Sequence, residues 1–247
     1  MAVNSLFTLE DIATQVALNY GDQTDFTIEK AKKWVNRALL RINEMGDWSW
    51  LMVFDATFNT ASGTEAYTLA DGVKRVYSLF ITSSTARRKL KLVDDRRFRE
   101  VYTNTVTPQG TPHIYRLYGR STAVGFEGRR KVALWPVPNA TYAMYYDYRR
   151  EIPLFTDALD ASGATVMEVT GMPAHMVDAL IELATAISFR ELDDSDYESA
   201  MAEAMARWNN LLADDLTEID DSIRMRAFNT ETSYFGDPVL PPQYGDT

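Results

Sequence analysis

The sequence predicts an α+β protein, in which two helices near the start of the chain and two near its end form a single four-helix unit. A β-rich module is inserted between the second and third helices. Apolar residues recur at steps of three and four in both terminal parts of the chain, whereas they alternate at period two over the roughly 100 residues between. Since no single amphipathic helix can bury its apolar face alone, the terminal helices are expected to share one core.

These patterns define three expected parts. Residues 1–51 and 172–221 are expected to form the α-helical domain. Residues 52–171 form the inserted, antiparallel β-rich module, and residues 222–247 form an extended C-terminal arm. With 247 residues, 46% of them hydrophobic, the chain is long enough for one large domain or two small ones with a real core.

The first two helices carry their own start and stop signals. Thr8 to Asp11 resemble a capping box with Asp in place of Glu, and Gly21 is expected to end the helix that follows. The second helix carries a continuous apolar stripe from Ile28 to Met45, with Thr27 as its expected N-cap and Gly46 as its stop. Joined by so short a loop, the two helices are expected to pack antiparallel.

Three of the five tryptophans follow closely on one another, at positions 34, 48 and 50. Trp34 falls on the apolar stripe and is expected to be ordinary core. Trp48 and Trp50 come after Gly46, where the helical period gives way to strand-like alternation. We expect these two side chains to form a core at the junction of the helical unit and the β module, and to fix the angle between them.

Strands are expected from Val53 onward, with a short helix over Asp94–Tyr102 and a loop or wide turn over Gly119–Gly128. Phe155–Gly171 is expected to be loop-like, with a hairpin at Gly163. Pro173 is placed to begin the third helix of the helical unit, and the last helix is expected to run roughly from Ser195 to Ile219.

The last 26 residues lose the helical period but keep scattered aromatic residues. A segment of this composition is expected to order against a partner. The candidate contact residues are Phe228, Tyr234, Phe235 and Tyr244.

Charge is distributed unevenly along the chain, whose net charge is −10. Residues 52–150 hold 16 Lys and Arg against 8 Asp and Glu, and the remaining residues hold 9 against 27. This asymmetry has two explanations: chance surface composition, or basic and acidic faces that meet between copies of the protein or between it and a partner. The candidate inter-subunit contacts are Arg87, Arg88, Arg96, Arg97, Arg129 and Arg130.

No motif points to catalysis, a metal or a cofactor. The sequence has no cysteine and no Walker-type phosphate loop, GxGxxG, HExxH or GxSxG motif. His113 and His175 have no neighbours suited to a triad or a metal site, and Glu191–Glu198 fails the calcium-loop pattern. We expect no membrane span and no signal peptide, because no stretch of 18 apolar residues and no basic N-terminal region occurs.

Six segments in a fixed order resemble the head-to-tail adaptor proteins of tailed bacteriophages, also described as connector or tail tubular protein A-like. The resemblance covers Thr8 to Leu216. The segments are WVNRALLRINEMGDWSWL, TASGTEAYTLADGVKRV (similar to the family's G-x-x-x-Y-x-L-P-x-D pattern), GTPHIYRLYG, KVALWPVPNA, YYDYRREIPL and MPAHMVDALIELATAISF. The sequence departs from the family pattern at Ala70, where proline is usual, and in the longer Phe155–Gly171 linker.

The resemblance implies a structural virion protein without catalysis, made in the host cytoplasm and placed at the head–tail junction. It implies a homo-oligomeric ring, commonly of twelve copies, that docks under the portal protein, extends the DNA channel and gives a tail nozzle or tail tube protein its attachment surface. Double-stranded DNA would pass through without sequence-specific binding. The tail after Ile219 has no match in the family pattern, and the expectation that its aromatic residues contact the portal or a neighbouring copy rests on its loss of helical period with retained aromatics.

Two alternatives from other classes remain open on sequence alone. A tail-associated cell-wall hydrolase would need a pair of carboxylates in a cleft, and the chain has many carboxylates. A DNA-binding module would use the basic clusters between residues 87 and 150. The acidic pI of about 4.8 disfavours this second alternative, since DNA binders are usually basic.

Overall fold

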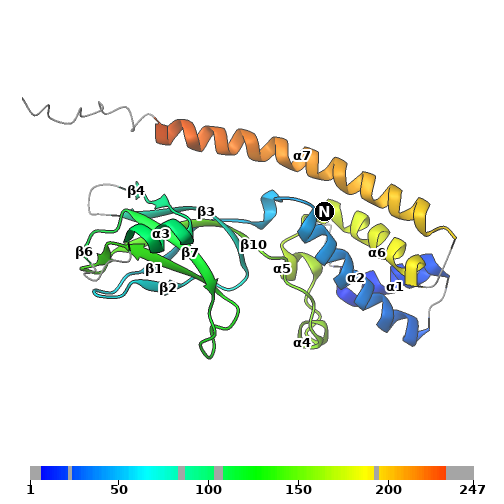
Figure 1. Cartoon of the computed structure of the whole chain (residues 1–247). Coiled ribbons are helices and arrows are strands. Elements are labelled where there is room, and N and C mark those ends of the chain that lie inside the picture. Colours follow the sequence, from blue (N-terminus) through cyan, green and yellow to red (C-terminus); the bar gives the residue numbers. More distant parts are fainter. Residues whose placement is uncertain (1–6, 22–23, 83–86, 103–107, 192–194, 232–247) are drawn as a thin grey trace, which may run out of the picture.

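The computed structural model describes residues 7–21, 24–82, 87–102, 108–191 and 195–231, with side chains in the last helix up to Asp215. It confirms the α+β class. Figure 1 shows a helical unit on one side, a β module on the other, and one long helix running past both. The helices are α1 (Leu9–Tyr20), α2 (Asp25–Met45), α3 (Asp95–Tyr102), α4 (Asp157–Ala161), α5 (Val166–Thr170), α6 (Val177–Glu191) and α7 (Tyr197–Glu231), with 3₁₀ turns η1 (Ser49–Leu51) and η2 (Ala174–Met176).

Helices α1, α2, α6 and α7 form the four-helix unit, and α6 is its central member because it packs against the other three. Most of the α6 side chains are buried, which is the pattern of a helix enclosed by its neighbours. Helix α1 begins at the expected capping box of Thr8 and Asp11 and ends at Gly21 in the left-handed conformation. The helical core combines small, aliphatic and aromatic side chains, among them Trp34, Trp48 and Trp208.

Helix α2 starts earlier than the sequence indicated. Thr24, not Thr27, is the N-cap, and its hydroxyl accepts a hydrogen bond from the backbone N–H of Thr27. Thr27 itself is buried inside the first turn. Two threonines three residues apart offer alternative caps, and the choice between them depends on which one the tertiary packing buries.

The β module contains two four-stranded sheets in the orders β1-β10-β3-β4 and β2-β8-β7-β5, and a two-stranded pair, β6-β9. Side chains from both larger sheets share one core, rich in tyrosine. The strands are β1 (Met52–Asn59), β2 (Ala66–Thr68), β3 (Val73–Thr82), β4 (Arg87–Lys89), β5 (Lys91–Leu92), β6 (Gln109–Gly110), β7 (Ile114–Arg120), β8 (Arg130–Trp135), β9 (Val137–Pro138) and β10 (Ala143–Arg150).

Two strand pairs differ from the antiparallel expectation. The pairs β5–β7 and β6–β9 are parallel, whereas the other pairs in the described residues are antiparallel. A parallel pair needs a long connection, and helix α3 lies in the connection between β5 and β7. The helix expected over Asp94–Tyr102 is therefore confirmed, and its buried Phe98 packs beside Val93 and Ile114.

The segment after β10 differs from the expected loop and hairpin. It forms two short helices, α4 and α5, separated by a turn at Gly163, where φ is +68°. Thr165 and Glu168 form a capping box at the start of α5. The buried side chains of Ile152, Phe155 and Val166 belong to the helical core, so this part of the expected module packs with the helices rather than with the sheets.

The last helix is longer than expected. Helix α7 continues to Glu231, so residues 222–231 are helical rather than extended. The sequence has no glycine or proline from residue 195 to residue 235, so no helix-breaking residue ends the helix where the apolar period is lost. Among the described residues, no helix combines the length and apolarity required to cross a membrane.

Candidate functional site

The junction between the helical unit and the β module runs from the end of α2 through Gly46–Leu51 into β1, with β3 and β10 beside it. Trp48 is fully buried here. Its indole Nε1 donates to the Ile42 carbonyl at 3.0 Å, and its ring meets Trp208 of α7 edge-on, with centroids 5.4 Å apart. Trp48 therefore joins the end of α2 to α7 through one apolar contact and one hydrogen bond.

Trp50 lies in a different environment. Its ring is 6.3 Å from that of Trp48, and it is only partly buried against the helical core. Its Nε1 is buried without a hydrogen-bond partner among the described residues. Both tryptophans thus lie at the junction, but Trp48 has a satisfied indole nitrogen and Trp50 does not.

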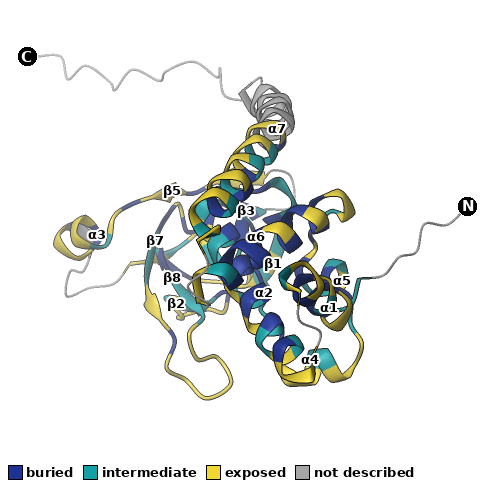
Figure 2. Cartoon of the chain, turned by 90° about the vertical axis from the view of Figure 1, so that its right-hand side faces the viewer, coloured by how far each residue is buried: buried dark blue, intermediate teal, exposed yellow. Residues whose placement is uncertain are grey.

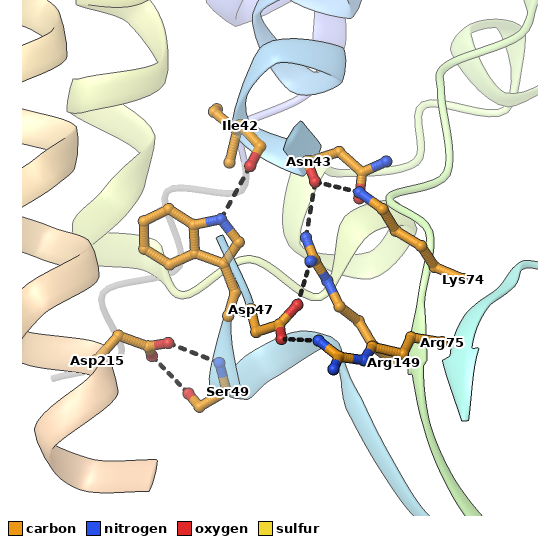
Figure 3. A network of polar contacts seen from close by, with 9 residues as sticks. Ile42, Asn43, Asp47, Ser49, Lys74, Arg75, Arg149 and Asp215 are labelled. Carbon is orange, nitrogen blue, oxygen red and sulfur yellow. Dashed lines mark hydrogen bonds and ion pairs between the residues drawn. The ribbon is translucent and has the colours of Figure 1, made fainter. Parts of the chain in front are cut away.

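The C-terminal end of α2 receives its cations from the β module. The last carbonyls of a helix lack intrahelical partners and lie at its negative end, yet α2 has no basic residue in its last turn. The Asn43 carbonyl instead accepts from Lys74 Nζ of β3 at 2.5 Å and from an Arg149 guanidinium nitrogen of β10 at 2.7 Å (Figure 3). The β module therefore caps the helix that leads into it.

Asp47, the residue after Gly46, adds an ion pair to this cap. Its carboxylate accepts from Arg149 at 2.5 Å and from Arg75 at 3.3 Å (Figure 3). The Arg149 side chain is only 5% exposed, whereas that of Arg75 is 66% exposed. A buried guanidinium requires a partner charge, so breaking the Asp47–Arg149 pair is expected to cost more free energy than breaking the exposed Asp47–Arg75 pair.

The titration of the junction groups follows from this arrangement. Burial acts to raise the pKa of Asp47, but the neighbouring Tyr77 hydroxyl and the Arg149 guanidinium outweigh it, and the pKa is lowered overall. Burial, with the Asp47 charge nearby, raises the pKa of Tyr77 to about 12. Burial and the charge of Arg149 lower the pKa of Lys74.

Helix α7 is tied to the same junction. The backbone N–H and the hydroxyl of Ser49 both donate to the buried carboxylate of Asp215, at 2.6 and 2.5 Å (Figure 3). Gly46 allows the close approach, because a Cβ there would lie 2.6 Å from Leu212 of α7. The junction therefore holds three bodies together: the end of α2, the β module and α7.

The basic residues predicted as inter-subunit contacts are partly used within the chain. Arg87 pairs with Asp55 at 2.6 Å and stacks on Phe80 and Tyr145. Arg88 donates to the Pro112 carbonyl, and Arg130 donates to the Val73 carbonyl.

The other three predicted contacts lie on the surface of the β module. Arg96 is 88% exposed and forms an i,i+4 pair with Glu100, and Arg97 is an exposed residue of α3. Arg129 is half-buried and stacks on Phe126. The structure does not bring the six arginines into one patch of shared contacts; they are spread over α3, β4 and the β7–β8 hairpin.

The family model described as SU10 adaptor protein matches residues 7–233. This match spans the helical unit, the β module and α7.

The chain belongs to the SU10 adaptor protein family.

Membership confirms the resemblance to phage head-to-tail adaptors and makes this family member a structural phage component, which implies a virion position at the head–tail junction. No curated protein matches the chain. Phe228 lies in α7 beyond the described side chains, and Tyr234, Phe235 and Tyr244 lie outside the described residues. Within the described residues, no three His, Asp or Glu side chains are grouped so that they could hold a metal ion.

Sequence reasoning found the two tryptophans of the junction, and the basic clusters that it noted between residues 87 and 150 include Arg149, but it missed Asp47 and Asp215. An aspartate after a helix-ending glycine is common on protein surfaces. Only the fold shows that Arg149, about 100 residues later, faces Asp47.

Proposed function

We propose that this family member is a non-enzymatic adaptor that assembles as a homo-oligomeric ring, of twelve copies, under the portal of the filled head. The ring would extend the DNA channel and give the tail nozzle or tail tube protein its attachment surface. The observation that carries the proposal is the family match over residues 7–233, which takes in every helix and strand that the structure describes.

The junction supports this role. A ring that connects two larger assemblies must keep its own parts in a fixed relative orientation. The contacts of Asp47, Arg149 and Asp215 are directional, and Arg149 and Asp215 are buried. The net acidic charge suits a channel component, because phosphates would be repelled rather than retained as DNA passes.

Arg87 does not favour a DNA-binding face, since the Asp55 carboxylate already compensates its charge, whereas Arg88 and Arg130 donate to backbone carbonyls and keep theirs. We further propose that the C-terminal aromatic residues contact the portal or a neighbouring copy.

The test is to mix the purified protein with purified portal rings and to image the product by electron microscopy. A second ring on the portal with twelve-fold symmetry is the expected result. Absence of binding at any concentration of the protein would overturn the proposal, and a ring of another symmetry would correct the copy number. Zymography on cell-wall material with the same preparation tests the hydrolase alternative; a cleared zone lost on replacing one Asp or Glu would support it.

A further inference from the structure

The loop of the β7–β8 hairpin, residues 121–129, exposes apolar side chains at its tip. Val124 is 92% exposed and Phe126 is 48% exposed, and Glu127 beside them is also exposed. Figure 2 shows this loop in yellow, standing out from the sheets. Val124 and Phe126 lie two residues apart on this projecting loop, and exposed apolar side chains near one another are candidates for contact with a partner.

The loop is held in one conformation by its own hydrogen bonds. Ser121 N donates to the Arg129 carbonyl at 2.7 Å, Gly128 N donates to the Ser121 carbonyl at 2.9 Å, and Phe126 N donates to the Ala123 carbonyl at 2.9 Å. Gly125 and Gly128 adopt positive φ values of +79° and +75°, which side-chain-bearing residues rarely adopt. Such a preorganised tip loses little entropy when it binds.

The helical unit has an open groove with matching chemistry. The groove lies between α2, α6 and α7 and has a volume of about 540 Å³, within the range of pockets that accept small ligands. Leu40, Ile187 and Met201 give it apolar walls, and Leu40 is 45% exposed.

The charges around the groove favour an acidic occupant. Arg37, Arg41 and Arg190 line it together with Glu44 and Glu191. Glu191 is already engaged, because it pairs with Arg37 and accepts from the Trp34 indole at 2.5 Å. The described lining residues, three Arg and two Glu, therefore carry a net positive charge, which complements the Glu127 carboxylate of the tip, while Arg129 of the same loop stays stacked on Phe126.

The tip belongs to the β module and the groove to the helical unit, which lie on opposite sides of the chain in Figure 1. Two different surfaces that meet between copies make a heterologous contact, and heterologous contacts form a ring when the rotation between successive copies closes. We propose that the hairpin tip of one copy, through Val124, Phe126 and Glu127, docks into the α2–α6–α7 groove of the next copy. The inference rests on the proposed ring and identifies its inter-subunit contact.

The absence of cysteine from the sequence allows a direct test. Single variants Val124→Cys and Leu40→Cys are mixed, assembled on portal rings and oxidised. The expected result is a disulfide-linked dimer in the mixture and none with either variant alone. Leu18→Cys is the matched control, because Leu18 is 41% exposed on α1, outside the groove. Equal cross-linking of Val124→Cys to Leu18→Cys, or a dimer from Val124→Cys alone, would overturn the proposal.

A charge exchange gives a second test. Glu127→Arg is expected to weaken ring assembly about tenfold, and the double variant Glu127→Arg/Arg41→Glu is expected to recover most of it. Glu203→Arg, an exposed substitution on α7 with the same change in charge, is expected to assemble normally. Lack of recovery in the double variant, with its thermal unfolding unchanged, would count against the contact. If the unaltered chain forms no ring on the portal, the proposed function fails; if it forms the ring without the cross-link, only this contact fails.

Discussion

The helical unit and the β module are each stabilised by an apolar core, whereas the junction that joins them is held by polar contacts. Each has its own core: the helices bury aliphatic residues and tryptophans, and the sheets bury aliphatic residues and tyrosines. The junction adds to these a small set of ion pairs and hydrogen bonds through Asn43, Asp47, Ser49, Arg149 and Asp215. Apolar burial is non-directional, whereas these contacts demand one geometry. The cores therefore give most of the stability, and the polar junction fixes the orientation of the helical unit relative to the β module.

Replacing Trp48 tests the helical side of this comparison and has the largest expected effect. Trp48→Ala is expected to lower the free energy of unfolding by about 3–5 kcal/mol, because it leaves a cavity beside Trp208 and removes a satisfied indole. Urea unfolding followed by tryptophan fluorescence measures it. Trp50→Phe is the control, with an expected cost below about 1 kcal/mol, since it removes a nitrogen that has no hydrogen-bond partner in the described part of the chain. An equal loss in both variants would contradict the distinction drawn between them.

The double variant Trp48→Ala/Trp50→Ala extends the test to assembly. Loosening of the β module against the helices is expected to impair ring formation on the portal. Normal assembly of this variant would show that the tryptophans do not set the angle between the two parts.

Asp47→Asn tests the junction itself. It leaves the buried Arg149 guanidinium without its counter-charge, and we expect a loss of about 2–4 kcal/mol. Arg75→Met removes the exposed partner of the same carboxylate and is expected to cost less than about 1 kcal/mol. Chemical denaturation of both variants checks the pair, and a larger loss for Arg75→Met would reverse the assignment.

Asp215→Asn probes the tie between α7 and the junction. The two Ser49 donors bind different oxygens of the carboxylate, and the substitution replaces one of these oxygens with an NH2 group, so we expect a loss of about 1–3 kcal/mol. Hydrogen exchange of the Ser49 amide should rise in the same variant. Glu203→Gln, on an exposed face of α7, is expected to leave both quantities unchanged.

The pH dependence of stability should report on Asp47. Its pKa in the folded protein is lowered from the ordinary 3.8, so the folded state binds its proton less readily than the unfolded chain. The stability that this carboxylate contributes is present above about pH 4 and is lost as the pH falls through the lowered pKa. Unfolding midpoints of the unaltered protein and of Asp47→Asn are therefore expected to differ at pH 7, and the difference is expected to shrink as the pH falls below about 4. A constant difference over that range would assign the effect to another group.

Removing residues 232–247 is expected to have the smallest effect on folding. The truncation removes none of the core and junction residues that the structure describes, so thermal unfolding is expected not to change. Portal binding should weaken, because Tyr234, Phe235 and Tyr244 are lost. Unchanged portal binding would remove these residues from the proposed contact.

The class of fold and the order of its parts could be predicted from the sequence alone. Helical and strand periods, the capping box at Thr8, the stop at Gly46 and the clustered tryptophans are local signals, and local signals predict local structure. The ordered motifs also indicated the family that the match over residues 7–233 confirmed.

The contacts that hold those parts together could not be predicted from the sequence and are seen only in the tertiary structure. The cap on α2 comes from Lys74 and Arg149, the choice of Thr24 over Thr27 follows from burial, and the parallel pairing of β5 with β7 depends on where α3 packs. In each case the partners are distant in sequence or compete with an equally plausible neighbour. Periodicity carries no information about such partners, because it reports which face of an element is buried and not what buries it.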